Sequence, residues 1–270
     1  MTIMPGEPAV AALWRYPVKS MQGEELNASE VTAAGLVGDR GFAVVDQATG
    51  KVAGAKNPRK WPGFFQFRAA YVTPPAAGAP LPAVRVTLPD GTCVTSDEAS
   101  IARLLSAALG RDVAFAAAAG PDPGQATAEG YDVDSDEVLD FQMPAGTFFD
   151  CGPVHIITTA TLDRLRSLYP AGRFEPRRFR PNIIVSTGPD AAGFAENEWV
   201  GRTVAVGDSV RLRVFKTTER CVMPTLPQYD LPKDPDILRT ALRHNDGAVG
   251  VYAEVLAGGT IRRGDPVTVR

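Results

Sequence analysis

The sequence predicts a mainly β fold with a few short helices, an α+β chain built from barrels or strongly bent sheets. Three observations lead to this fold class. Many short apolar stretches alternate with polar residues, which is the pattern of half-buried strands. Turn signals are frequent, with 26 glycines and 23 prolines among 270 residues. Only three short segments have helical features, and this mixture is typical of barrel architectures.

The first half of the chain is expected to form short strands separated by turns. Gly50 can supply the positive φ of a hairpin turn over residues 46–50, and a second hairpin turn is expected over 89–92. The Pro/Ala/Gly-rich stretch 73–83 lacks periodicity and is expected to be a loop. The predicted strands of this half are 10–16, 26–31, 42–46, 64–72, 84–88 and 93–95.

A helix is expected over residues 97–109. Ser96 can cap its N-terminus, the acidic residues at 97 and 98 suit the positive end of the helix dipole, and Gly110 can end it. Apolar residues recur on one face at helical spacing. This helix therefore is expected to cover a core and to carry no chemistry.

The second half repeats the β-rich pattern and adds two short helices. One helix is expected over 159–168, stopped by Pro170, and another begins at Asp234, with Pro235 at the first helical position. His155 lies inside an apolar run, where a hydrogen-bonded core histidine is favoured over a ligand or a base. The predicted strands are 154–157, 183–186, 203–206, 210–215, 248–255 and 266–269.

A stretch of low complexity separates the two halves. Residues 114–130 are rich in Ala, Gly, Pro and Asp, which is the composition of a linker or loop at a domain boundary. We therefore predict two domains, 1–118 and 131–270. The acidic stretch 132–140 is expected to be a solvated face.

Charge and composition exclude several classes of function. The net charge is −3, so no overall basic field is present to hold nucleic acid or an anionic membrane. Residues 1–10 do not read as a signal peptide, and no apolar run approaches the ~18 residues of a membrane span. Three cysteines lie far apart without a C-x-x-C pair, which argues against a zinc site or a disulfide framework. The expected location is cytoplasmic.

The strongest chemical signal is Cys221, which directly follows Arg220 where a strand pattern breaks into a polar turn. A guanidinium beside a thiol favours the thiolate, which is both the nucleophilic and the metal-binding form. The alternative is that Cys221 is a small buried hydrophobe, as many free cysteines are.

Two motifs in the first half offer groups for an anion. In the motif Y-P-V-K-S, Pro17 ends a strand and sets Lys19 and Ser20 on the turn that follows. In the motif G-D-R-G-F, two glycines bracket Arg40 and its acidic neighbour immediately before a strand. The alternatives are a solvated lysine on a loop and a turn with an internal ion pair.

A third motif places three arginines within four positions, in the stretch E-P-R-R-F-R-P-N at residues 175–182. The planar guanidinium matches phosphate oxygens bidentately, Pro181 is expected to force an extended backbone at Arg180, and Asn182 opens the next strand. A solvated basic turn is the alternative. No Walker loop, G-x-G-x-x-G or G-x-S-x-G motif is present. One thiol and several anion-binding groups suit a ligand with phosphate at one end and a thiophilic centre at the other, as in a metal–pterin cofactor.

Taken in order, these motifs resemble the MOSC-domain family in its two-part form, which has an N-terminal β-barrel domain. The resemblance spans about residues 10–269 and is carried by Y-P-V-K-S, G-D-R, R-F-R-P-N-I-I-V, R-C and the terminal G-D-P-V. That form includes the amidoxime-reducing component and its bacterial relatives. It implies a β-barrel-like first domain packed on a MOSC β-barrel domain, with a cofactor cleft between them.

The resemblance also implies a molybdenum cofactor, Mo-molybdopterin, with Cys221 as the metal ligand and catalytic centre. Five positions match those that hold the pterin phosphate and its surroundings: Lys19, Ser20, Arg40, Arg180 and Asn182. Thr158 falls where the family presents a hydroxyl at the start of a helix. Glu219 stands where the family often has serine or another small residue, and it is counted here as a cofactor contact.

The chain departs from the family after the cysteine, where P-T-L-P-Q replaces the usual T-T-V-D-P and removes an aspartate. The leading hypothesis is a molybdenum oxidoreductase that reduces N-hydroxylated or N-oxide small molecules. Its electrons are expected from a separate flavin or iron–sulfur protein. Two alternatives stay open: a sulfur-transfer protein carrying a persulfide on Cys221, and a non-catalytic carrier of the molybdenum cofactor.

Overall fold

Strands from both ends of the chain form one eight-stranded sheet. The computed structural model describes residues 7–118, 126–131, 137–144, 146–188 and 191–270. In spatial order the strands of this sheet are β18 (Val267–Val269), β14 (Thr203–Val206), β15 (Val210–Glu219), β16 (Ala248–Ala257), β12 (Val154–Thr158), β13 (Ile183–Ser186), β1 (Ala9–Arg15) and β2 (Glu24–Leu26). Only β12 and β13, among the pairs in the described sheet, run parallel.

Four smaller sheets complete the β structure of the described residues. They consist of β17 (Gly259–Arg262) with β3 (Ala28–Thr32) and β4 (Gly35–Leu36); β5 (Phe42–Asp46) with β9 (Val113–Ala117); β6 (Arg68–Tyr71) with β7 (Val84–Thr87) and β8 (Cys93–Thr95); and β10 (Thr127–Tyr131) with β11 (Val138–Gln142).

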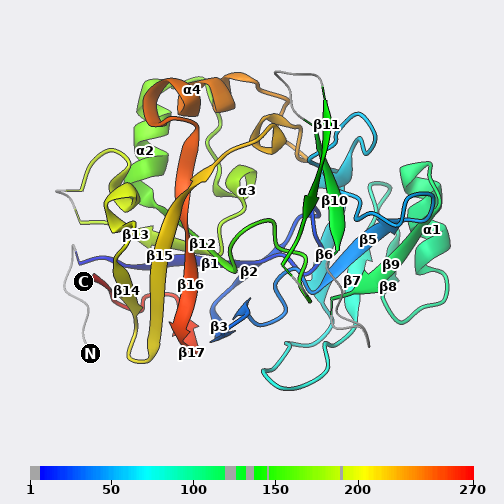
Figure 1. The fold of residues 1–270 in the computed structure, drawn as a ribbon, viewed down its shortest axis with the longest axis horizontal. Coiled ribbons are helices and arrows are strands. Elements are labelled where there is room, and N and C mark those ends of the chain that lie inside the picture. Colours follow the sequence, from blue (N-terminus) through cyan, green and yellow to red (C-terminus); the bar gives the residue numbers. More distant parts are fainter. Residues whose placement is uncertain (1–6, 119–125, 132–136, 145, 189–190) are drawn as a thin grey trace.

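Helices are few and short. The α-helices are α1 (Ile101–Leu109), α2 (Thr159–Leu168), α3 (Pro176–Phe179) and α4 (Asp236–Asn245), and single 3₁₀ turns cover Phe64–Gln66, Ala195–Trp199 and Met223–Thr225. Along the long axis of the molecule, α1 with β5 to β9 lies at one end, and the large sheet with α2 and α4 lies at the other (Figure 1). The predicted fold class, mainly β with a few short helices, is confirmed.

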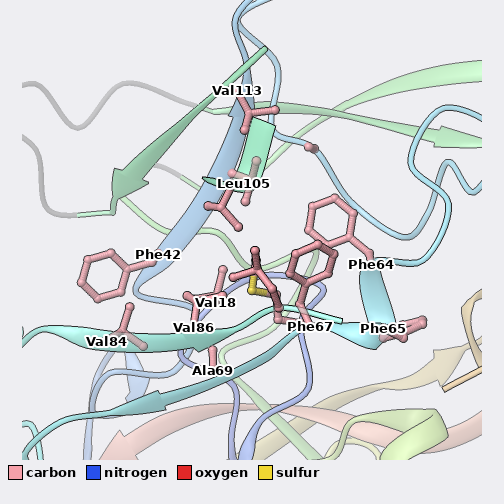
Figure 2. Packing of buried hydrophobic residues seen from close by; sticks show 14 of the residues in the cluster. Val18, Phe42, Phe64, Phe65, Phe67, Ala69, Val84, Val86, Leu105 and Val113 are labelled. Atoms are coloured by element: carbon pink, nitrogen blue, oxygen red, sulfur yellow. The ribbon is translucent and has the colours of Figure 1, made fainter. Parts of the chain in front are cut away.

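A large aromatic core fills the first half of the molecule. Figure 2 shows Phe42 on one side of this core and Phe64 and Phe67 on the other, with Val86 and Leu105 between them. All five side chains are buried. Burying side chains of this size contributes about 1.5–3 kcal/mol each to the stability of the fold. The cluster therefore stabilises the part of the molecule that carries the turn after β1 and the segment before β5.

The two halves share their sheets and cores. Leu13 of β1 pairs with Ile183 of β13 and packs into the core of the large sheet. In return, Met223 of the second half packs into the aromatic core of the first. The domain boundaries at 118 and 131 stay a prediction, but the first strand hydrogen-bonds within the sheet of the second half.

The linker expected over residues 114–130 is wrong at both ends. Residues 114–117 belong to β9, which pairs with β5, and residues 127–130 belong to β10, which pairs with β11. The pattern was missed because β9 is rich in alanine and β10 contains alanine, glutamate and glycine, all of which have weak strand propensity. Residues 119–125 of that stretch and 132–136 of the acidic stretch lie outside the described residues.

Two helical predictions need correction. Helix α1 begins at Ile101 rather than at residue 97, because Glu98 instead accepts a hydrogen bond from the Thr95 amide, 2.8 Å, in a preceding turn. Helix α3 was not predicted, and Arg180 ends it in the left-handed region rather than extending the chain. No helix in the described part of the chain is long and apolar enough to cross a membrane.

Candidate functional site

One polar pocket is lined by residues from distant parts of the chain. The residues that the argument below uses are Lys19, Ser20, Arg40, Gly54, Lys56, Glu129, Asp150, His155, Arg180, Asn182, Arg220, Met223 and Tyr252. They come from the turn after β1, the segments before and after β5, β10, the loop before β12 and β12 itself, the turn from α3 into β13, the segment after β15 and β16. The pocket therefore depends on both halves of the chain.

Five residues predicted as cofactor contacts line this pocket: Lys19, Ser20, Arg40, Arg180 and Asn182. All five residues except Arg40 are buried, and Arg40 is largely buried. The structure therefore brings residues of both sets of motifs to one pocket, and their role as cofactor contacts stays a prediction. What the pocket binds is a separate question.

Two other predicted contacts, Thr158 and Glu219, do not line this pocket. Thr158 is fully buried and caps α2, where its Oγ1 accepts a hydrogen bond from the Thr161 amide and donates one to Glu196 at 2.5 Å. Glu219 is exposed at the end of β15, opposite Ala248. Any role for either residue in cofactor binding stays a prediction.

Backbone strain is concentrated at this pocket. Of the five described non-glycine residues with a positive φ, three line it: Ser20 at 64°, Arg40 at 48° and Arg180 at 57°. Such conformations cost about 1–3 kcal/mol each and persist where the surroundings impose them, most often at functional sites. Pro181 does not extend the backbone at Arg180, because the chain must turn there from α3 into β13.

A carboxylate bridges the two lysines of the pocket. Lys19 Nζ lies 2.5 Å from Asp150 Oδ1 and donates to the Phe148 carbonyl at 2.8 Å, and Lys56 Nζ lies 3.1 Å from Asp150 Oδ2. Burial raises the pKa of Asp150, but the two ammonium groups outweigh it and hold that pKa well below its ordinary value. Burial lowers the pKa of Lys19 to about 8, despite the opposing effect of Asp150.

Two guanidinium groups meet at the Tyr16 ring. The Cζ atoms of Arg40 and Arg180 lie 5.0 Å and 4.1 Å from its centroid. Burial lowers the pKa of Arg40, yet its ion pair with Asp39 raises it above the ordinary value overall. Arg180 donates to the Met21 carbonyl at 2.5 Å, and burial together with the charge of Arg40 lowers its pKa to about 10. An anion beside Arg180 would relieve that repulsion.

Arg220 brings an unsatisfied donor to the pocket. Its Nη2 donates to the Phe179 carbonyl at 3.0 Å, and its amide donates to the Gly247 carbonyl at 2.9 Å. Within the described structure its Nε is buried and has no hydrogen-bond partner. A buried N–H without an acceptor costs about 1–3 kcal/mol, so a ligand oxygen in reach of Nε would be stabilised.

His155 is a hydrogen-bonded core histidine, as predicted, and it also lines the pocket. Its ring nitrogens lie 3.4 Å from the Arg180 carbonyl and 3.2 Å from the Val249 carbonyl. Burial, reinforced by the charge of Arg220, lowers its pKa to about 3, so the ring is neutral near pH 7. Gly250, at φ 88°, makes room for it, because a Cβ there would lie 2.4 Å from Nε2.

Cys221 is not among the residues that line the pocket, although two residues close to it in the chain are. Its neighbour Arg220 and the nearby Met223 line the pocket, and the half-buried thiol packs against the aromatic core. Both interpretations made from the sequence, a small core residue and a reactive thiol, fit this position. In the described residues no group of three or more His, Cys, Asp or Glu side chains is arranged to hold a metal ion.

Positive charge exceeds negative charge in the lining. Five cationic residues, Lys19, Lys56, Arg40, Arg180 and Arg220, face two carboxylates, Glu129 and Asp150. Glu129 is also bonded to Lys60 at 3.0 Å. Opposite charges within a few ångströms in a partly buried site interact strongly, so this excess favours a ligand with more than one negative charge.

Sequence reasoning missed several residues of this pocket. Arg220 had been considered only as a neighbour of the thiol, although its own side chain faces the ligand space. Lys56 and Tyr252 belong to no motif that singled them out, because the tertiary fold alone brings them to the pocket. The three-arginine motif did signal a site, but only Arg180 of the three lines it.

Fold and pocket together define a β protein with a strongly cationic site beside a cysteine. Comparison with protein families agrees with this description. Residues 7–111 match the MOSC N-terminal beta barrel domain, and residues 144–268 match the MOSC domain. The two matches leave only short segments uncovered, and the chain belongs to the family of MOSC-domain proteins that carry this N-terminal barrel.

Two curated relatives extend the comparison over nearly the whole chain. Mitochondrial amidoxime-reducing component 1 of Mus musculus is 27% identical over 292 residues, covering 96% of this chain and 81% of the relative. Mitochondrial amidoxime reducing component 2 of Rattus norvegicus is 26% identical over 293 residues, covering 96% and 82%. Among solved structures, the YUAD protein from Bacillus subtilis covers 97% of this chain and 94% of its own, with 14% identity and a TM-score of 0.49, a similarity too low to support a conclusion.

Proposed function

We propose that this chain is a molybdenum-cofactor oxidoreductase that reduces N-hydroxylated or N-oxide small molecules. The observation that carries the proposal is the pocket itself, where five cationic residues from both halves converge and three lining residues are held in strained backbone conformations. The membership in the MOSC family supports the cofactor, and the names of the two relatives support an amidoxime or similar substrate.

The residues present fit an anionic cofactor with a thiophilic centre. Arg40, Arg180, Lys19 and the orphaned Nε of Arg220 are suited to phosphate oxygens, because charge-assisted hydrogen bonds are roughly twice as strong as neutral ones. Cys221, directly after Arg220 in the chain, supplies the soft sulfur ligand that molybdenum would take. When bound, the cofactor supplies oxygen-atom transfer, with two electrons and two protons consumed and water released for each N–OH reduced to N–H.

The protein's own contribution is position, charge and exclusion of water. The neutral ring of His155, fixed between two carbonyls, cannot serve as a proton donor near pH 7, and it instead orients the turn that carries Arg180. Lys19 has a pKa of about 8, so it is the lining group whose charge changes just above neutral pH. The residues that place the ligand are thus largely fixed in charge.

Electrons have to come from outside the chain. We propose a separate flavin or iron–sulfur protein as the donor, in keeping with the resemblance to amidoxime-reducing components. We also propose a cytoplasmic location, which differs from the mitochondrial location in the names of the two relatives. The alternatives, sulfur transfer through a persulfide on Cys221 and a non-catalytic carrier role, predict different outcomes in the following experiment.

The test is expression in a host that makes the molybdenum cofactor, with Cys93→Ser as the matched control for Cys221→Ser. Cys93 is exposed and remote from the lining, so its variant should behave as wild type. We expect molybdenum and pterin in the wild-type protein, together with reduction of benzamidoxime by reduced viologen dye. Cys221→Ser should abolish that activity without changing the melting temperature. Molybdenum without turnover would indicate a carrier; a persulfide without molybdenum would indicate sulfur transfer.

A further inference from the structure

A second cavity lies beside the cationic pocket and is not explained by a cofactor. It has a volume of about 770 Å³, within the ~300–1,000 Å³ range of small-molecule sites. Apolar side chains dominate its walls, among them Trp61 and Phe64 from the first half and Leu238 and Leu242 from α4. The rings of Trp61 and Phe64 meet edge to face with centroids 6.2 Å apart, so this wall is rigid.

The two cavities share their dividing wall. Gly54 and Lys56 face the cationic pocket, whereas Ala55 between them faces the apolar cavity. In a second segment, Arg220 and Met223 face the first cavity, and Val222 and Thr225 face the second. These segments form a turn and a 3₁₀ turn, in which neighbouring side chains point in different directions, so both segments lie between the two cavities.

Cys221 belongs to this dividing wall. It follows Arg220, which lines the cationic pocket, and precedes Val222, which lines the apolar cavity. Consecutive Cα atoms lie about 3.8 Å apart. A molecule seated in the apolar cavity therefore has one end within a few ångströms of the segment that carries the thiol.

The charged side chains that line the apolar cavity are all cationic. Its lining includes Arg59, Lys233 and Arg239 and, among the described residues, no carboxylate. Asp236 outside the lining pairs with Arg239 at 3.1 Å. Arg59 lies with its Cζ 4.4 Å from the Tyr131 ring centroid, and Lys233 is exposed. In a chain with a net charge of −3, three cations around an apolar floor select against cationic ligands.

We propose that this cavity binds small molecules with an apolar, ring-sized body and a carboxylate group. On the proposed reductase function, it holds the body of the substrate while the reducible N–O group reaches the Cys221 segment. The proposed substrates are therefore aryl compounds without a positive charge. In the anionic ones, the carboxylate of the substrate points toward Lys233 and Arg239.

The test is a calorimetric titration of the full-length, cofactor-free protein with 2-naphthoate, 2-naphthylmethanol and 2-naphthylmethylammonium. We expect saturable one-to-one binding in the order naphthoate, alcohol, ammonium, from tightest to weakest. Lys233→Glu should weaken naphthoate roughly three- to tenfold and leave the alcohol unchanged. Leu242→Glu should weaken both ligands roughly five- to tenfold by removing apolar contact.

Two exposed residues outside the lining provide matched controls. Arg103→Glu on α1 controls for the change of charge, and Leu256→Glu, 48% exposed against 54% for Leu242, controls for the loss of a surface leucine. Both should bind all three probes as wild type does. Absence of naphthoate binding, tighter binding of the ammonium probe, or equal affinities in Lys233→Glu and wild type would overturn the proposal. The proposal would also be overturned if the wild-type protein self-associates and Leu242→Glu does not, because the cavity would then bind a second copy of the chain.

These titrations need no molybdenum, so their outcome is independent of the reductase proposal. If naphthoate binds but no molybdenum is found, the apolar binding site is supported and the reductase proposal is contradicted. If molybdenum is found but naphthoate does not bind, the reductase proposal is supported and the binding site is contradicted. In cofactor-loaded protein, Leu242→Glu should raise KM for 4-carboxybenzamidoxime and leave kcat near wild type, since α4 binds the substrate body and does not touch the reacting group.

Discussion

Arginines at the surface of this molecule and in the pocket differ in whether a carboxylate neutralises them, although Arg177 and Arg180 are only three positions apart in the sequence. At the surface, Arg177 and Arg173 lie 2.6 Å and 2.8 Å from the carboxylate of Asp230, and Arg173 also pairs with Glu175 at 2.5 Å. In the pocket, Arg180 has no carboxylate within salt-bridge distance among the described residues and relies on the Met21 carbonyl. The surface arginines are neutralised by carboxylates of the protein, whereas Arg180 is not.

Arg178, between them, shows a third arrangement. It is fully buried and donates to the carbonyls of Arg173, Pro224 and Pro232 at 2.8, 2.8 and 2.9 Å. Its guanidinium thus holds the segment that follows Cys221. The number of arginines in a motif therefore says little about binding. What distinguishes Arg180 is that its buried guanidinium lines the pocket and has no carboxylate within salt-bridge distance among the described residues.

The largest expected effect is on stability, for Arg178→Met. The change keeps much of the apolar stem but leaves several buried carbonyls without their donor, so we expect a loss of about 3–5 kcal/mol in the free energy of unfolding. Chemical denaturation measures it. Arg177→Met is the control: its salt bridges lie at the surface and should be worth no more than about 1 kcal/mol. Similar losses in both variants would show that burial does not distinguish the two arginines.

A smaller effect is expected when the internal counter-ion of the pocket is removed. Asp150→Asn frees Lys19 and Lys56 from their shared carboxylate, which makes the pocket more cationic when Lys19 keeps its proton. Because the loss of Asp150 also lowers the pKa of Lys19 further, sulfate binding is compared at pH 6. Sulfate should bind about ten- to thirtyfold more tightly, since a charge-assisted contact is worth ~1.5–2 kcal/mol. The measurement is calorimetric titration of cofactor-free protein. Weaker or unchanged sulfate binding would mean that Asp150 does not compete with an anion.

The pH dependence of anion binding should reflect Lys19. Its folded pKa is lowered to about 8, so its ammonium form is largely present at pH 7 and largely lost at pH 9. Sulfate affinity should therefore fall as pH rises through 8, by up to about tenfold between pH 7 and 9. In Lys19→Arg, which stays protonated, this fall should disappear. A fall of equal size in the variant would assign the titration to another group.

Local sequence features predicted most of the strands but not how the halves combine. Alternating apolar residues marked 42–46, 183–186 and 203–206, and these strands were confirmed. The pairing of Leu13 with Ile183 depends on contacts 170 positions apart, which no local pattern encodes. The two ends of the expected linker form strands because each has a partner strand, and this tertiary effect overrides their weak propensity.

The sequence predicted those residues of the candidate site that belong to a recognisable motif. Lys19, Arg40 and Arg180 were found from motif order, and they do meet in one pocket. Lys56 and Tyr252 were not, because their contribution comes from position in the fold. The left-handed conformations at the pocket were equally unforeseen, since nothing in their local sequence demands a positive φ.

The central claim, that the cationic pocket holds a phosphate-bearing molybdenum cofactor, is tested most directly by cofactor occupancy. Molybdenum and pterin per chain should be measured for wild type, Arg180→Ala and Arg177→Ala, all purified from a host that makes the cofactor. We predict near-complete occupancy for wild type and Arg177→Ala, and an apparent affinity ten- to about hundredfold lower for Arg180→Ala. Equal occupancy in the two variants, or no cofactor in the wild-type protein, would contradict the claim.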